Sequence, residues 1–339
     1  MPTWAFTGAD AEFFDQYLAD FLPDRIFDAH AHLFSQDHFR EEGLSPALAS
    51  MPPRLGLPEY RHYAEWLHPE ARTVGGLFFG LAFQAGRQAN NDFVAAEMES
   101  EWDAEDDSGQ HWVGQLVVTP SMQRDEILML LRAGDFVGLK CYHTMAKVDG
   151  PTFAAPIEAY LPEAHVRLAH ELGLTITLHM VRDRALADPD NQRTIRHYCL
   201  RYPNMRLILA HAARGFNPWH TIQGIDSLRG IHNVWFDTSA VTETGAFEAI
   251  IETMGHERLL YGTDFPVSHM RGRCVAVGDS FHWIYADELD HAEKHAHLQP
   301  VLIGLESLRA LRMACMHTKL SHQQIQDIFY NNAEFLFDI

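Results

Sequence analysis

The pattern of apolar segments narrows the choice of folds for this chain of 339 residues more than any other feature. Eight short apolar runs, rich in β-forming residues, alternate with segments whose apolar residues recur at helical spacing. Repeated strand-then-helix units are typical of parallel sheets covered by helices. The predicted strands span residues 26–32, 76–83, 112–120, 136–143, 174–180, 206–212, 234–240 and 259–267.

Helices are predicted between and after these strands, and several have clear stop and start signals. Gly173 and Gly255 follow two of them as helix stops, and Ser321 is a suitable N-cap for the last. Eight strand–helix units predict a single closed (β/α)8 barrel, a TIM barrel. The competing fold is an open doubly wound sheet. The chain has no G-x-G-x-x-G motif after its first predicted strand to support that fold. The predicted helices span residues 124–133, 156–172, 191–201, 244–254, 306–319 and 321 to about 335.

The chain shows no linker rich in proline, glycine or serine that would divide it into two halves. We therefore expect one barrel over residues 24–339, with residues 1–23 as an N-terminal extension packed on it. Two stretches are too long for plain turns: roughly 33–60 after the first strand and roughly 268–305 after the eighth. In a barrel these loop insertions would cover the carboxyl-end mouth, where active sites are built. Within the second, the histidine-rich run 291–297 is expected to form a solvated face.

Composition and charge exclude several classes of partner. A formal net charge of -20 repels phosphate backbones, so nucleic acid is not expected as a partner, although local arginines still permit a small anionic substrate. No apolar run reaches the roughly 18 residues of a membrane span, and residues 1–22 lack the basic start of a secretory signal. The composition leaves a homo-oligomer open. A cytoplasmic protein with reduced thiols is expected from the scattered Cys141, Cys199, Cys274 and Cys315.

The segment Asp28-Ala-His-Ala-His at the end of the first predicted strand carries the strongest chemical signal. Side chains alternate along a strand, so His30 and His32 should point the same way, into the barrel mouth. Two neutral imidazoles at this spacing can bind one divalent ion, and Zn²⁺ suits them. Asp28 shares their face one layer deeper, either as a partner of the histidines or as a buried, hydrogen-bonded carboxylate.

Further polar residues end other strands at matching depth. His179 follows the apolar run of the fifth strand, His211 that of the sixth and Asp264 that of the eighth. Burying these three together with the His30–His32 pair is costly unless an ion or a hydrogen-bond network satisfies them. The sequence therefore predicts a metal site at the carboxyl end of the barrel.

These segments together resemble the amidohydrolase superfamily. Within it, they are most similar to the amidohydrolase-related (amidohydrolase 2) family of metal-dependent hydrolases and decarboxylases, over roughly residues 24–338. The resemblance implies a barrel, a divalent metal, and hydrolysis or C–C bond cleavage of a small substrate. The segments that carry it are Ile26-Phe-Asp-Ala-His-Ala-His, Gly138-Leu-Lys-Cys, His179, Ala210-His-Ala, Tyr261-Gly-Thr-Asp-Phe-Pro and Ile328-Phe-Tyr-Asn-Asn-Ala-Glu-Phe-Leu-Phe.

The resemblance also implies a role for each residue. His30, His32 and His179 match the imidazole ligands of the family, and Asp264 matches the eighth-strand carboxylate that ligates the metal and accepts a proton from water. His211 matches the histidine that acts as acid or base in one-metal members. Lys140 matches the lysine that is carboxylated in two-metal members; here we expect it to anchor a substrate anion instead.

We therefore expect one divalent metal, with zinc favoured by the ligand types and manganese as the alternative. A second ion is expected only if Lys140 is carboxylated. His143, three residues after Lys140, and Arg214, three residues after His211, are candidates for binding substrate. For the other arginines that follow strand ends, a surface or loop-pinning role is the more expected one: Arg182, Arg184, Arg271 and Arg273.

The leading functional hypothesis is a metal-dependent hydrolase of a small, carboxylated lactone, ester or amide. The alternative is a metal-dependent non-oxidative decarboxylase, because both reactions use nearly the same ligands in this family. The third is a barrel that serves as a non-catalytic scaffold, which the five polar strand-end residues disfavour. The sequence offers no G-x-S-x-G motif to support a serine hydrolase.

Overall fold

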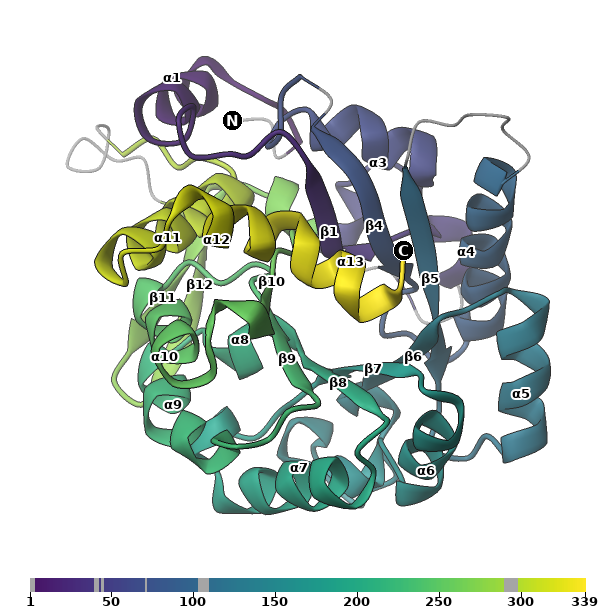
Figure 1. The fold of residues 1–339 in the computed structure, drawn as a ribbon. Coiled ribbons are helices and arrows are strands. Elements are labelled where there is room, and N and C mark those ends of the chain that lie inside the picture. Colours follow the sequence, from purple (N-terminus) through teal and green to yellow (C-terminus); the bar gives the residue numbers. More distant parts are fainter. Residues whose placement is uncertain (1–3, 40–42, 44–45, 71, 103–109, 290–297) are drawn as a thin grey trace.

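The computed structural model describes residues 4–39, 43, 46–70, 72–102, 110–289 and 298–339. Eight strands form one sheet whose order follows the chain, and every neighbouring pair is parallel. Figure 1 shows this sheet curving round, with helices on its outer side. The strands are β1 (Ile26–His32), β4 (Thr73–Phe79), β5 (His111–Val118), β6 (Gly138–Tyr142), β7 (Thr175–His179), β8 (Arg206–Leu209), β9 (Val234–Asp237) and β10 (Leu259–Leu260).

The sheet closes between its first strand and the segment that follows the last. The Ala29 amide donates to the Tyr261 carbonyl at 2.8 Å, and Ala31 forms a parallel bridge with Phe265. The amide of Asp264 in turn donates to the His30 carbonyl at 2.8 Å. These contacts make a nearly closed eight-stranded barrel, which confirms the predicted TIM-barrel architecture.

Helices cover the outside of the barrel, and two of them, α5 and α10, have the bounds predicted from the sequence. Both have an apolar side that is buried toward the strands. The main outer helices are α4 (Arg87–Trp102), α5 (Arg124–Ala133), α6 (Glu163–Leu172), α7 (Pro189–Arg201), α9 (Pro218–Gly224), α10 (Thr244–Met254), α11 (Ile303–His317) and α12 (His322–Gln326).

Some predicted elements are shorter than expected. The predicted helix 156–172 begins only at Glu163, because Pro162 lacks an N–H and its ring blocks the preceding helical turn. The predicted strand 206–212 ends at Leu209, where the backbone enters a left-handed turn, α8 (Ala210–Arg214). Of the predicted strand 259–267, only β10 pairs with a neighbouring strand as regular β-structure. The last predicted helix is divided into α12 and α13 (Asn332–Phe337), with a π-helical turn between them.

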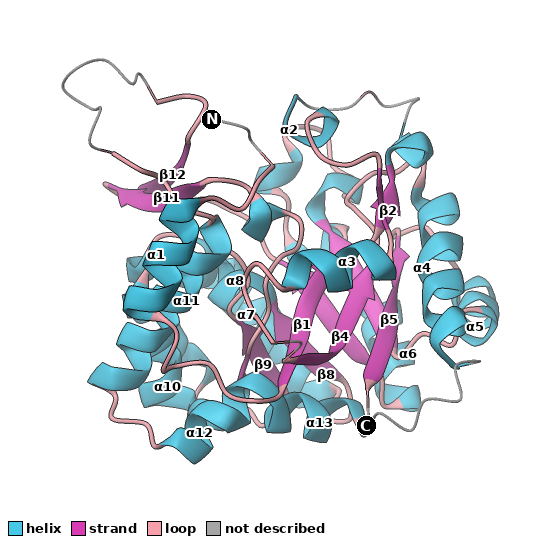
Figure 2. Cartoon of the chain, turned by 90° about the horizontal axis from the view of Figure 1, so that it is seen from above, coloured by secondary structure: helices cyan, strands magenta, loops and turns pink. Residues whose placement is uncertain are grey.

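Both predicted insertions are present at one end of the barrel. The first contains the short pair β2 (Phe34–Ser35) and β3 (Arg54–Leu55), with α2 (Pro46–Ala49) and α3 (Leu57–Ala64). The second contains the hairpin of β11 (Gly272–Val277) and β12 (Ser280–Tyr285). Figure 2 shows β11–β12 and α2 on the side of the molecule opposite to α12 and α13. The run 291–297 lies outside the described residues.

The C-terminal helix closes the amino end of the barrel. Figure 1 shows α13 lying across the strands. The rings of Phe27 and Phe337 stack there with centroids 5.5 Å apart, and Tyr330 and Leu336 are buried in the same cluster. Because this end is packed with apolar side chains, polar residues inside the barrel face the opposite, carboxyl end.

The structure also describes the N-terminal segment and the cysteines. Helix α1 (Gly8–Tyr17) contacts α11, and Asp10 forms a buried ion pair with Arg271. All four cysteines are free and buried, and burial raises the pKa of Cys141 to about 12. In the part of the chain that the structure describes, no helix is both long and apolar enough to cross a membrane.

A buried histidine between the first insertion and the barrel leads to a prediction about acid stability. His68 lies with one ring nitrogen 2.9 Å from Thr73 Oγ1 and the other 2.6 Å from the Tyr261 hydroxyl, and burial lowers its pKa from 6.5 to about 3. Below pH 6.5 the unfolded chain therefore binds a proton that the folded chain does not, and stability falls as the pH falls.

From pH 7.5 to 5.5 this residue alone should cost about 1.4 kcal/mol of the free energy of unfolding. Urea titrations of wild type and His68→Gln at both pH values test this, because the variant should lack that part of the loss. An equal loss in the two proteins would contradict the prediction.

Candidate metal centre

The first strand carries a β-bulge at the predicted histidine motif. Asp28 pairs with Gly76 and Ala31 with Phe78, so three steps along β1 match two along β4. Such a bulge re-aims side chains and is common beside active sites. His30 and His32 both reach the barrel mouth, with ring centroids 5.4 Å apart. The structure therefore brings this predicted pair together, with the bulge adjusting the simple strand alternation.

Asp264 lies beside both histidines because of the loop that follows β10. Its Oδ1 is 3.1 Å from His32 Nε2 and 3.4 Å from His30 Nε2. Gly262 permits this approach, since a Cβ there would lie 2.9 Å from the Cβ of His30. Asp264 itself has a left-handed backbone, with φ of 65°. A non-glycine residue in that conformation costs energy that the surrounding contacts must offset, as happens at functional sites.

Asp28 forms hydrogen bonds with the same loop after β10. Its Oδ1 accepts from the Thr263 amide at 2.8 Å, and its Oδ2 accepts from the Tyr60 hydroxyl at 2.9 Å and from Thr263 Oγ1. It also accepts from the backbone amide of His30 at 3.1 Å. The sequence left two interpretations of Asp28 open, a partner of the histidines or a buried, hydrogen-bonded carboxylate. These contacts fit the second, in which Asp28 joins β1, α3 and the loop after β10.

His211 is aimed into the mouth by the left-handed turn of α8. Residues 211–214 all have φ between 52° and 59°, so the chain turns sharply as soon as β8 ends. The His211 ring lies 4.9 Å from the His30 ring and 4.8 Å from the His179 ring, between centroids. The His211 Nε2 and His179 Nδ1 atoms are 3.1 Å apart. His179 at the end of β7, His211 just after β8 and His30 in β1 are thus neighbours, as their positions in the sequence predict.

Lys140 lies deeper, and the other two predicted residues lie nearer the rim. Lys140 is fully buried on β6 with Nζ 3.2 Å from His30 Nε2 and 4.0 Å from the centre of the Phe79 ring. The His143 ring lies 5.6 Å from the His179 ring. Arg214 is partly buried and donates to the Arg182 carbonyl at 2.9 Å. Lys140 and His143 therefore adjoin the histidine cluster, and Arg214 follows it in sequence at the mouth.

Three of these side chains form the group best suited to bind a metal. Among the described residues, one ligand atom each of His30, His211 and Asp264 lie within 4.8 Å of one another. His32 touches this group through Asp264, and His179 touches it through His211. The predicted ligand set placed His32 and His179 beside His30 and Asp264 and gave His211 a separate role. The geometry thus brings His211 as near to the centre as the predicted ligands, and the division of roles stays a prediction.

The electrostatics of the centre match the needs of a divalent ion. Burial lowers the pKa of His30 to about 3, and it also lowers the pKa of His32 and His179, so these imidazoles are neutral and keep a lone pair. Burial alone would raise the pKa of Asp264, but His211, His32 and His30 together hold it below its usual value. A metal needs neutral imidazoles and an ionised carboxylate, and this donor set provides both.

Lys140, at the bottom of this centre, can change its charge near neutral pH. Burial lowers the pKa of its ammonium to about 7, while Asp237 and Asp264 counteract part of that effect. Near pH 7 it is therefore partly neutral, so its charge opposes a bound cation less than a surface lysine would. The residues present consequently fit a divalent ion.

Two residues of this centre were missed by the sequence analysis. Asp237, at the end of β9, has Oδ2 2.8 Å from His30 Nδ1, and Ser239 has its hydroxyl 2.8 Å from His211 Nδ1. Both are fully buried. The signal that identified His179 and Asp264 was a polar residue after an apolar strand, and Val234-Trp-Phe-Asp carries the same signal. Asp237 was therefore predictable, whereas Ser239 lies in the irregular segment beyond the strand.

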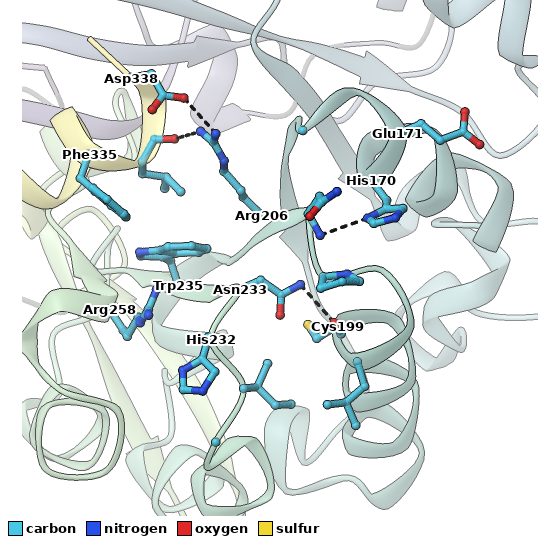
Figure 3. Close-up of a pocket in the computed structure, with 17 residues that line it drawn as sticks. His170, Glu171, Cys199, Arg206, His232, Asn233, Trp235, Arg258, Phe335 and Asp338 are labelled. Atoms are coloured by element: carbon cyan, nitrogen blue, oxygen red, sulfur yellow. Dashed lines mark hydrogen bonds and ion pairs between the residues drawn. The ribbon is translucent and has the colours of Figure 1, made fainter.

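A large cavity lies at the opposite end of the barrel, away from these residues. It has a volume of about 680 Å³ and lies between α13 and the amino ends of β8 and β9. Figure 3 shows the ion pair of Arg206 with Asp338 beside this cavity, and the guanidinium of Arg258 over the ring of Trp235. None of the predicted site residues lines this cavity. The chemistry therefore belongs to the histidine cluster at the carboxyl end.

Comparison with known families agrees with this geometry. The family model described as Amidohydrolase matches residues 27–339, which is nearly the whole barrel. The chain belongs to the amidohydrolase family. The matched region contains every residue of the centre described above, from His30 to Asp264. No curated protein matches the chain.

Solved structures of amidohydrolase relatives share the fold at low sequence identity. An amidohydrolase from Burkholderia multivorans with bound Zn has a TM-score of 0.60 at 14% identity, covering 93% of this chain and 99% of its own. A probable 2-pyrone-4,6-dicarboxylic acid hydrolase from Acinetobacter baumannii with bound citric acid has a TM-score of 0.56 at 17% identity, covering 93% and 100%.

A third amidohydrolase-like structure represents the other reaction class. A dihydroxybenzoic acid decarboxylase from a Polaromonas species, with bound manganese and the inhibitor 2-nitroresorcinol, has a TM-score of 0.56 at 15% identity. The alignment covers 93% of this chain and 97% of the decarboxylase. At such identities the likeness establishes the shared fold, and this fold occurs in both hydrolases and decarboxylases.

Proposed function

We propose that this amidohydrolase is a metal-dependent hydrolase of a small, carboxylated lactone, ester or amide. The observation that carries the proposal is the group of His30, His211 and Asp264 ligand atoms within 4.8 Å at the carboxyl end of the barrel. The fold of hydrolase relatives supports it, including the probable 2-pyrone-4,6-dicarboxylic acid hydrolase. Two basic residues adjoin the centre, Lys140 below it and Arg214 at the rim, and both would suit the carboxylate of such a substrate.

We expect one divalent ion per chain, held by His30, His32, His179 and Asp264, with His211 in contact with the same group. Zinc is favoured by the imidazole ligands, and manganese is the alternative. A second ion is expected only if Lys140 is carboxylated. When bound, the ion would polarise a carbonyl oxygen and lower the pKa of water toward neutrality.

The residues of the chain then divide the remaining work. Asp264 is ionised and lies against two imidazoles, so it can accept the proton of the attacking water. His211 can take up that proton at Nε2 and pass it to the leaving group, and Lys140 can stabilise negative charge that develops on the acyl oxygen. Arg214 and His143 would hold the carboxylate of the substrate, which orients the acyl carbon toward Asp264.

Removal and return of the metal test the proposal directly. Dialysis against a strong chelator should abolish hydrolysis of any substrate that the protein cleaves, and one equivalent of Zn²⁺ or Mn²⁺ should restore it. Elemental analysis before and after gives the ion content, and the substrate panel should include 2-pyrone-4,6-dicarboxylate and other carboxylated lactones, esters and amides. Hydrolysis that persists in protein shown to lack metal, or no hydrolysis by metal-loaded protein, would contradict the proposal.

The second candidate function is non-oxidative decarboxylation, which the shared fold of the manganese-containing dihydroxybenzoic acid decarboxylase favours. In that reaction His211 would deliver a proton to the carbon that loses CO2. Assays of CO2 release from dihydroxybenzoates and related acids separate the two functions. Release of CO2 without hydrolysis of any lactone, ester or amide would replace the hydrolase proposal with the decarboxylase.

A further inference from the structure

The carboxylate of Asp237 contacts two of the central histidines, His30 and His211. Its Oδ2 lies 2.8 Å from His30 Nδ1, and its Oδ1 accepts from the backbone amide of His211 at 2.8 Å. The Ser239 amide and hydroxyl also donate to Oδ1. Asp237 is fully buried at the end of β9. Its position is therefore defined by three neighbouring segments.

These contacts determine which nitrogen of His30 carries the proton. An ionised carboxylate can only accept hydrogen bonds, so the nitrogen that faces Asp237 Oδ2, His30 Nδ1, must be the N–H. The other nitrogen, Nε2, then has the lone pair. Lys140 Nζ, 3.2 Å away, can donate to that lone pair, and Asp264 Oδ1 lies farther off at 3.4 Å, so the lone pair faces the centre.

His211 is held in the same form by a different acceptor. Its Nδ1 lies 3.0 Å from the backbone carbonyl oxygen of Ser239, and a carbonyl oxygen can only accept. The Ser239 hydroxyl, also near this nitrogen, gives its own proton to Asp237, so it is a second acceptor here. His211 Nδ1 therefore carries a proton, and in the neutral ring the lone pair is on Nε2, which lies 3.1 Å from His179 Nδ1.

We propose that Asp237 is a positioning residue of this centre. Together with the Ser239 carbonyl it holds His30 and His211 as Nδ1-protonated tautomers, which present the Nε2 lone pairs to the space they share with Asp264. Neutral histidine in water favours the opposite, Nε2-protonated form, so the protein must impose this choice. The tautomers follow from the hydrogen bonds alone, and only their consequence for metal binding rests on the proposed function.

The substitution Asp237→Asn is the most direct test. The backbone amide of His211 and the groups of Ser239 all donate toward Oδ1, so the asparagine oxygen takes that place and its NH2 faces His30 Nδ1. His30 then has to accept at Nδ1 and carry its proton on Nε2, which removes the lone pair from the centre. We expect the affinity for Zn²⁺ to fall by about 10–100-fold, measured by competition with a chromophoric chelator.

Nitrogen NMR of metal-free, ¹⁵N-labelled protein reads the tautomer without any assay of activity, because N–H and lone-pair ring nitrogens have separate shifts. We expect Nδ1-protonated His30 and His211 in the wild type, and Nε2-protonated His30 in Asp237→Asn. Signals are assigned from His30→Gln and His211→Gln.

The matched control is Asp226→Asn, which makes the same chemical change at a side chain that is 76% exposed and pairs with Arg229. Both tautomers and the Zn²⁺ affinity should stay near those of the wild type in this variant. An Nε2-protonated His30 or His211 in the wild type would overturn the proposal, and this needs no variant to fold. So would an unchanged His30 tautomer in folded Asp237→Asn. If the wild type has the expected tautomers but cleaves no substrate, the proposal about Asp237 holds and the proposed function is refuted.

Discussion

Replacing Asp264 by asparagine should lower kcat/KM for any cleaved substrate by about 10²–10⁴-fold. The carboxylate is ionised because His211, His32 and His30 hold its pKa down, and it lies 3.1 Å from His32 Nε2. Asparagine has no negative charge to balance a divalent ion, and it cannot take up a proton from water at neutral pH. Steady-state kinetics together with the metal content of the purified variant measure the effect.

Asp226→Asn is the matched control, because it makes the same chemical change at the surface. Asp226 pairs with Arg229 at 2.7 Å, and its side chain is 76% exposed. This variant should keep the kcat/KM and metal content of the wild type. An Asp264→Asn protein with unaltered kinetics and metal content would remove Asp264 from both the ligand set and the acid–base step.

Replacing Asp10 by alanine should destabilise the protein by about 3–5 kcal/mol. Asp10 and Arg271 are both buried and form a two-pronged ion pair, with N–O distances of 2.9 and 2.6 Å. Asp10 also accepts from the Leu302 amide at 3.1 Å, so it joins the N-terminal segment to the insertion after β10 and to the start of α11. Without Asp10 the guanidinium of Arg271 is left buried with no carboxylate partner. Urea titration gives the change in the free energy of unfolding.

The matched control for this pair is Asp20→Ala. Asp20 pairs with Arg312 at 2.8 Å, but its side chain is 77% exposed, so we expect a loss of only about 0–1 kcal/mol. The double variant Asp10→Leu with Arg271→Met should recover most of the stability, because it replaces both charges by apolar groups. Equal losses in Asp10→Ala and Asp20→Ala would show that burial does not govern the contribution of the Asp10 pair.

Arg271 also shows what position in the sequence can and cannot predict. It follows the eighth strand, as the substrate-binding candidate Arg214 follows the sixth, and a surface or loop-pinning role was expected for it. In the structure Arg271 is buried and pins loops, because it donates to Asp10 and to the carbonyls of Ala5 and Pro300. The partner itself, Asp10, lies 261 residues away in the chain. No local pattern could have paired the two.

The sequence was most informative where a local rule acts. Apolar, β-rich segments of seven to nine residues predicted the eight strands, and the bounds of β1, α5 and α10 were predicted correctly. The polar residues that end apolar strands predicted most of the centre, because parallel strands in a barrel bring their carboxyl ends to one rim. The same rule points to Asp237, which follows the apolar run of the seventh strand.

The choice of barrel, the location of the centre and the residue types that line it were therefore determined by the sequence alone, since they depend on periodicity and on strand ends. Only the tertiary structure decided how those residues meet. The bulge in β1, the left-handed turns at His211 and Asp264, and the close approach at Gly262 set the distances between the imidazoles and the carboxylate. These features arise from contacts between segments that lie far apart in the chain, so no pattern within a single segment could specify them.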